Sequence, residues 1–212
     1  MRLTLLTLIS LVLVGGCAAE HRLMRASDDA RFPALTGDAD RYLPHRQEWT
    51  RREGLGVKGE VVATFEDPAL GADYLAHLAR TQGIGEVSRN AYFETMWAAL
   101  YGPQQDRLPI QVTLRFDRLF HTPASLEPER WEFLLQDDDG RRWEPLHLGD
   151  RSTPAGERGK LAATFRLWFK TREPGMRPMI DGRLRELTLH VRGNPGTASL
   201  RWKFKGASPS HD

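Results

Sequence analysis

Apolar and polar residues alternate along much of this chain. The first alternating stretch covers residues 57–65, where Val61, Ala63 and Phe65 share one side. Alternation with a period of two is typical of a β-strand that buries one face and exposes the other, as in antiparallel sheets. Five similar stretches follow Pro109, and we expect a strand in each: residues 110–116, 131–135, 161–169, 187–191 and 200–204.

Between the first two stretches the apolar spacing changes to that of helices. Asp67 and Pro68 predict a helix start, because aspartate caps helices and proline suits the first turn. Two apolar stripes follow, separated by two glycines around Ile84 and ended by Gly102. The pattern predicts a two-helix hairpin at residues 67–102. The stripes are Leu70, Tyr74, Leu75 and Leu78, then Tyr92, Phe93, Met96, Trp97 and Leu100.

Together these elements predict a mainly β fold with a single domain at residues 55–205. Strands with one apolar face each favour an antiparallel immunoglobulin-like β-sandwich, or a small barrel, with the helical hairpin inserted. The acidic residues 137–139 and Gly140 predict a turn, after which Trp143 is placed to start another strand. Residues 206–212 are expected to form a disordered tail.

The last two strands also predict a register. Residues 194–197, Asn-Pro-Gly-Thr, fit a type II turn with proline and glycine at its centre. Pairing the two ends of this turn places Val191 opposite Leu200 and Leu189 opposite Trp202 on the buried face. It also sets His190 opposite Arg201 and Thr188 opposite Lys203 on the outer face.

The N-terminus has the order of a secretory signal. Arg2 precedes an uncharged, mostly apolar run at residues 3–14, which is shorter than the roughly 20 residues that a membrane-spanning helix needs. Gly15 and Gly16 then precede Cys17. This stretch resembles the lipobox of bacterial lipoproteins, which implies that residues 1–16 are removed and that Cys17 is acylated.

The resemblance to lipoproteins also implies a location. An acylated Cys17 anchors the chain to a lipid bilayer, and Ala18 after the cysteine is usual for lipoproteins sent to the outer membrane of two-membrane bacteria. Residues 17–54 are polar and broken by proline and glycine, so we expect a lipidated N-terminus and a flexible tether. Within that tether, Tyr42, Leu43 and Trp49 are apolar enough to pack on the domain.

Cysteine content and charge exclude several function classes. The chain has one cysteine, so no internal disulfide is possible, and an acylated Cys17 supplies neither a nucleophile nor a metal ligand. Its 30 basic and 28 acidic residues give a formal charge of +2. Because a nucleic-acid-binding domain is usually strongly basic, we do not expect a nucleic-acid partner.

The histidines show no catalytic or metal-binding spacing. None lies in a short zinc motif, so no metal is expected. His147, Asp150 and Ser152 are the residue types of a nucleophilic triad, but the chain has no G-x-S-x-G motif around the serine. The histidines scattered across the predicted tether, helices and strands are His45, His77, His121, His147 and His190.

Two loops approach ligand-binding motifs without completing them. The acidic turn at residues 137–140 lacks the glutamate of an EF-hand, since Leu146 stands in its place. Residues 156–160 look like a phosphate-binding loop, but Pro154 occupies the first glycine position and Leu161 replaces the hydroxyl residue. We therefore assign no catalytic residue and no cofactor.

A candidate binding surface comes from the outward residues of the later strands. If the odd residues of the stretch at 161–169 are buried, Arg166 and Trp168 face the other way. Neighbouring strands would join them into a basic surface with an aromatic centre. The alternative is that the helical hairpin covers Trp168. The outward residues of the last two strands are His190, Arg192, Arg201, Lys203 and Lys205.

These observations favour a non-catalytic binding or scaffolding module in the cell envelope. Its expected partners are the bilayer, through Cys17, and an envelope protein or an anionic polysaccharide, through Arg166, Trp168 and the basic residues of the last hairpin. The alternative is a hydrolase of envelope polysaccharide or peptide, whose site would be assembled from scattered histidines and from acids such as Glu127 and Glu129.

Overall fold

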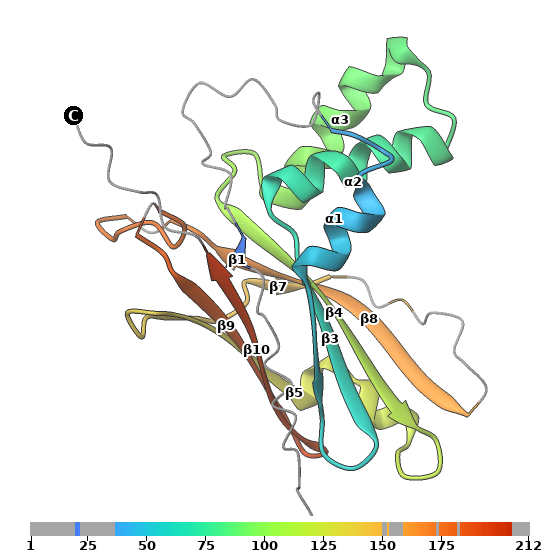
Figure 1. Ribbon diagram of the computed structural model, residues 1–212, viewed down its shortest axis with the longest axis vertical. Coiled ribbons are helices and arrows are strands. Elements are labelled where there is room, and N and C mark those ends of the chain that lie inside the picture. The colour runs from blue at the N-terminus through green and yellow to red at the C-terminus, as the bar shows by residue number, and fades with distance from the viewer. Residues whose placement is uncertain are drawn as a thin grey trace, which may run out of the picture.

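The computed structural model describes residues 20–21, 37–149, 152, 159–172, 174–181 and 183–204. Within these residues the protein is mainly β, with two largely antiparallel sheets and a group of helices at one end (Figure 1). Sheet A has the strand order β1-β10-β9-β5-β6, and sheet B the order β2-β3-β4-β8-β7. Only the short contact between β1 and β10 is parallel among the described pairs.

The elements have the following bounds. Sheet A contains β1 (Glu20–His21), β10 (Gly196–Phe204), β9 (Glu186–Gly193), β5 (Trp131–Asp137) and β6 (Arg142–Trp143). Sheet B contains β2 (Thr50–Gly54), β3 (Gly59–Phe65), β4 (Arg107–Asp117), β8 (Lys160–Lys170) and β7 (His147–Leu148). The helices are α1 (Tyr42–Trp49), α2 (Pro68–Thr81) and α3 (Glu86–Tyr101), with 3-10 turns η2 (Pro123–Leu126) and η3 (Pro128–Arg130).

The core lies between the two sheets. Alternate residues of every long strand are buried, as the sequence pattern predicts. Aromatic rings from the two sheets meet there: the ring of Phe65 lies 5.6 Å from that of Trp202, and Phe133 lies 5.4 Å from Phe165. The sheets therefore pack face to face, and all six predicted strands are confirmed, together with a strand at Trp143.

The predicted helical hairpin is confirmed as α2 and α3. The Asp67 carboxylate accepts a hydrogen bond of 2.7 Å from the Leu70 amide, which caps α2. The facing stripes of α2 and α3 form a second apolar core, in which Leu75, Phe93 and Trp97 are buried. Because both helices bury their apolar stripes, the hairpin is a stable unit seated at one end of sheet B (Figure 1).

The predicted tether is wrong from residue 37 onward, because that part of the chain belongs to the fold. Trp49 at the end of α1 is only 2% exposed and stacks on Phe65 with 5.2 Å between ring centroids. Its carbonyl accepts a 2.8 Å hydrogen bond from the Trp202 indole, and β2 pairs with β3 directly after it. A single tryptophan gives no periodicity that sequence analysis can detect, yet it buries a large apolar area.

The predicted register of the last hairpin is wrong by two residues. Gly193 pairs with Gly196, so the loop contains two residues, and Leu200 lies opposite Leu189. Tertiary contacts explain the shift: a Cβ atom on Gly193 would lie 2.6 Å from the Trp131 ring, and one on Gly196 would lie 2.7 Å from a backbone nitrogen of the β2–β3 loop. A shift of two preserves which face each side chain occupies, so the predicted buried face is correct.

Candidate functional site

The structure divides the predicted basic surface between two sheets. Arg166 and Trp168 lie on β8 in sheet B, whereas His190, Arg201 and Lys203 lie on β9 and β10 in sheet A. All five side chains point away from the core, so the two groups face opposite sides of the molecule. The prediction of one surface with a central tryptophan is therefore wrong, because alternation does not show which strands are neighbours.

Arg166 and Trp168 attach the helical hairpin to sheet B. The Arg166 guanidinium contacts both carboxylate oxygens of Glu66, at 2.7 and 3.0 Å. Burial opposes the charge of Arg166, but the Glu66 carboxylate outweighs it and raises the arginine's pKa. The Trp168 indole donates a 2.8 Å hydrogen bond to the carbonyl of Leu100 on α3. This confirms the alternative expectation, in which the hairpin covers Trp168.

The outer face of sheet A remains open and carries the candidate site. In Figure 1 the described helices lie on the side of β3, β4 and β8 and leave this face free. The outward residues of β10 alternate strictly with buried ones, and the Arg201 side chain is 59% exposed. The face presents four exposed cations, Arg142, Arg192, Arg201 and Lys203, and we call it the basic face.

Two carboxylates lie among these cations. Glu186 forms a 3.1 Å ion pair with Arg201 and lies opposite Lys203, and Glu132 lies opposite Arg192. Because exposed ion pairs of this kind are weak, both arginines remain available to a ligand. On β5, β6, β9 and β10, these four exposed cations outnumber the two carboxylates, Glu132 and Glu186.

His190 occupies the centre of the basic face. Its Nδ1 atom lies 3.0 Å from the hydroxyl oxygen of Ser199, the residue opposite it on β10. Partial burial lowers the pKa of His190, and the positive charges of Arg142 and Arg201 lower it further. Arg142 on β6 and Arg201 on β10 therefore both act electrostatically on the ring between them.

A polar groove extends the basic face toward the β9–β10 turn. It has a volume of about 500 Å³ and is lined by Glu129, Arg130, Trp131, Glu132, Arg192, Gly193 and Asn194. Sequence analysis missed it, because its two sides come from η3 with β5 and from the end of β9, about 60 residues later in the sequence. Charged groups of both signs line it, which suits a hydrogen-bonding ligand better than an apolar one.

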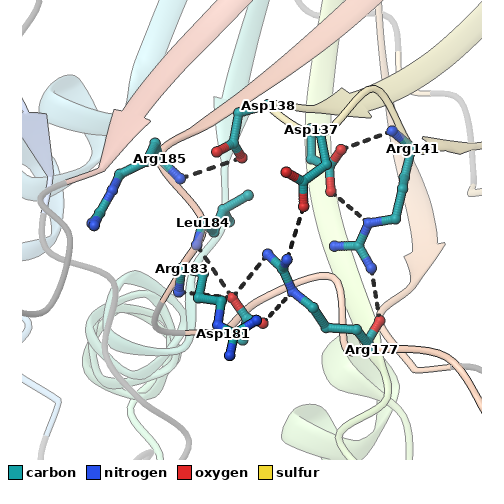
Figure 2. Close-up of polar contacts among 9 residues, drawn as sticks. Asp137, Asp138, Arg141, Arg177, Asp181, Arg183, Leu184 and Arg185 are labelled. Atoms are coloured by element: carbon teal, nitrogen blue, oxygen red, sulfur yellow. Dashed lines mark hydrogen bonds and ion pairs between the residues drawn. The ribbon is translucent and has the colours of Figure 1, made fainter.

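Arginine side chains bind the carboxylates of the acidic turn that the sequence analysis compared with a calcium motif. Figure 2 shows Arg141 and Arg177 reaching the carboxylates around this turn. Arg141 contacts Asp137 at 2.7 Å, and Arg177 contacts Asp139 at 2.8 Å and Asp181. The carboxylates therefore fix the loop between β8 and β9. In the part of the chain that the structure describes, no group of three or more histidine, cysteine or acidic side chains is arranged to hold a metal ion.

A buried charge cluster joins α1 to α2. The Asp73 carboxylate is inaccessible to solvent and lies 2.7 Å from the Arg41 guanidinium and 2.8 Å from the His45 ring. Burial opposes ionisation of Asp73, but hydrogen bonds from Arg41, from the Asp38 amide and from His45 outweigh it and lower its pKa. Because each group already has its partner, the cluster acts as a structural clamp on the N-terminal helix.

The two other candidate residues, Cys17 and Lys205, lie outside the described residues. Among the described helices, none is long and apolar enough to cross a membrane. No known protein family matches the chain, and a search of curated proteins finds no significant sequence similarity. Fold and site together define a mainly β domain of two facing sheets, with a helical hairpin on one side and an open basic face on the other.

Proposed function

We propose that this chain is a lipid-anchored module of the bacterial cell envelope, held at the outer membrane, that binds its partner without catalysis. The basic face of sheet A is the binding surface in this proposal, and its exposed cations around His190 are the observation that carries it. The lipobox pattern at Cys17 supports the membrane location. We also propose that the two sheets form an immunoglobulin-like sandwich.

The chemistry of the basic face favours an anionic partner. Guanidinium groups bind carboxylate, sulfate and phosphate groups in a bidentate manner, and Arg142, Arg192 and Arg201 present theirs to solvent. A flat sheet with cations on several strands suits an extended polymer, which contacts many of them at once. The adjoining groove gives such a polymer further hydrogen-bonding groups. An anionic envelope polysaccharide, or an acidic surface of an envelope protein, has this chemistry.

Charge reversal tests the binding surface. We expect the full chain, purified in detergent, to bind dextran sulfate, and Arg201→Glu combined with Lys203→Glu to weaken binding about tenfold or more, since both cations become repulsive. Arg89→Glu on the exposed surface of α3 is the control for a charge reversal away from the face, and it should bind like the wild type. Equal affinities for all three proteins would exclude the basic face as the binding site.

A separate experiment tests the anchor. The wild type should carry acyl mass on Cys17 and fractionate with membranes, whereas Cys17→Ser should carry none. A wild type without acyl mass, together with a variant that fractionates in the same way, would contradict the anchor and leave the basic face untouched.

The competing hydrolase hypothesis predicts turnover. Incubation of the chain with labelled cell-wall fragments would release soluble products if Glu129 or another acid catalysed hydrolysis. We expect intact fragments. Product release that a Glu129→Gln substitution abolishes would replace the binding proposal by the enzymatic one.

A further inference from the structure

An exposed apolar tip lies at the opposite end of the molecule from the helices. Leu119 is 86% exposed, Val57 63% and Phe120 56%. They come from two loops, at residues 55–58 and 117–122, which hydrogen bonds join. The His121 ring lies 2.7 Å from the Val57 carbonyl oxygen, and the backbone amide at the start of the second loop donates to the carbonyl of Lys58. We call this surface the apolar tip.

The apolar tip is an ordered turn. The Leu119 amide donates a 2.9 Å hydrogen bond to the Asp117 carboxylate, and the Phe120 amide donates to the Asp117 carbonyl. The amide of Arg118 donates to the carbonyl of Gly159 at 3.0 Å. These contacts hold the backbone so that the apolar side chains point into solvent. Large apolar side chains held together in this way mark an interaction site.

Cations surround the apolar tip. Lys58 and Arg118 are exposed beside it, and the Lys160 side chain is 45% exposed. Asp117, at the start of the second loop, contacts the Lys160 ammonium at 3.7 Å and accepts a hydrogen bond from the Leu119 amide, so its charge is partly compensated. An anionic surface is therefore the electrostatic complement of this end of the molecule.

We propose that the apolar tip inserts into a lipid bilayer with anionic headgroups. Leu119 and Phe120 would enter the boundary of the acyl chains, while Lys58 and Arg118 contact headgroup phosphates. A bilayer fits this surface better than a protein does. Stable protein interfaces bury about 800 Å² on each partner, far more than three side chains on a convex turn supply. The convex apolar tip can insert into a bilayer without a complementary groove.

This inference goes beyond the proposed function, because it adds a membrane contact that needs neither acylation nor the basic face. The test must distinguish insertion of the tip from membrane binding through the apolar run at residues 3–14, which can itself bring the full chain to vesicles. The depth of a label placed in the tip distinguishes the two, because it reports where the tip itself lies. The fraction of protein bound to vesicles does not, because either segment can cause binding.

The experiment uses the full chain with Cys17→Ser, which removes the only native thiol, and Leu119→Cys carrying a nitroxide label. Met176→Cys is the matched control, since Met176 is 52% exposed on a loop away from the tip. On vesicles of phosphatidylcholine and phosphatidylglycerol, we expect collisions of the label at 119 with oxygen to rise and those with a water-soluble nickel chelate to fall. The expected depth is about 5–10 Å below the headgroups. The control label should stay in water.

A label at 119 that is as accessible to the nickel chelate as the label at 176 would overturn the proposal. If it remains aqueous on vesicles but becomes immobilised by a soluble envelope protein, the tip is a protein-binding site and the bilayer is excluded. Both outcomes leave acylation of Cys17 and the basic face unaffected.

The cations are tested by Lys58→Glu combined with Arg118→Glu in the chain labelled at 119. Both side chains are exposed, so the fold should be unaffected. We expect the inserted fraction to fall about tenfold on anionic vesicles and to change little on pure phosphatidylcholine. Equal insertion of both proteins into anionic vesicles would contradict the role given to the headgroup charge.

Discussion

Asp67 shows how one residue combines a structural role with an electrostatic cost. Its carboxylate caps α2, yet it is only 1% exposed, and burial raises its pKa to about 6 against the hydrogen bond from Leu70 and the charge of His45. In the unfolded chain the carboxyl titrates near 3.8. As the pH falls, the carboxyl of Asp67 is therefore protonated in the folded state before it is protonated in the unfolded chain. The contribution of Asp67 to the free energy of unfolding consequently rises as the pH falls from about 6 to about 4.

Asp67→Asn should remove that pH dependence. An asparagine oxygen still caps the helix, so we expect the free energy of unfolding at pH 7.5 to be unchanged or to rise by about 1–2 kcal/mol, because no buried carboxylate remains. The rise in the free energy of unfolding that we expect for the wild type between pH 7.5 and pH 5 should be absent. Urea unfolding at both pH values checks this, and a variant that keeps the wild-type pH dependence would contradict it.

His190 predicts that binding to the basic face strengthens in acid. The pKa of this histidine is lowered by burial and by Arg142 and Arg201, whereas a bound polyanion neutralises those charges and raises it. Binding then takes up a proton, and affinity increases as the pH falls from neutral through the pKa of His190. We expect a several-fold gain in dextran sulfate affinity between pH 7.5 and 5.5. His190→Gln should lose most of that gain, and an equal gain in both proteins would assign the effect elsewhere.

At the scale of single elements, alternation decided which side chains face the core. Each predicted strand exists, and Arg166, Trp168 and Arg201 all point outward as expected. Alternation carries no information on which strands pair, so the sequence did not reveal that β8 and β9 belong to different sheets. The predicted register of the last hairpin was wrong because it, too, depends on contacts between distant segments. Its two glycines are held by Trp131 and by the β2–β3 loop, which lie far away in the sequence.

Helix α1 provides a direct test of where the folded domain begins. Because Trp49 is buried between both sheets, Trp49→Ala should lower the free energy of unfolding by about 3–5 kcal/mol. Leu43→Ala on the same helix is the control, since Leu43 is 56% exposed, and should change it by less than about 0.5 kcal/mol. Denaturant unfolding followed by circular dichroism measures both. A tether at residues 17–54 would instead predict that both substitutions have no effect.

At the scale of the whole molecule, charge is segregated although the total is only +2. Several acids are paired with arginines in structural clusters, as Asp73, Glu66 and Asp137 are. The described strands of the basic face and the rim of the apolar tip consequently carry more cations than carboxylates, although Arg201 and Lys160 each contact an acid. Composition alone gives no sign of this separation. Both surfaces also join distant segments, such as Val57 with His121, which local sequence patterns cannot connect.

The two proposed membrane contacts predict how the domain lies on a bilayer. Cys17 is three residues before β1, which pairs with the end of β10 at Lys203, while the apolar tip packs beside Gly196 at the other end of that strand. At about 3.3 Å per residue, Gly196 and Lys203 are about 23 Å apart. If the anchor and the inserted tip hold opposite ends of β10, we expect the axis of this strand to lie closer to the membrane plane than to the membrane normal.

Polarised infrared spectroscopy of the acylated protein on supported anionic bilayers measures this orientation. We expect dichroism of the amide I band to report strands tilted toward the membrane plane. Leu119→Ser combined with Phe120→Ser removes the tip contact without touching the anchor, and should abolish most of the order, because a domain held at one end rotates freely. Both residues are largely exposed, so the fold should tolerate the change. Equal dichroism in the two proteins would mean that the anchor alone, or another surface, sets the orientation.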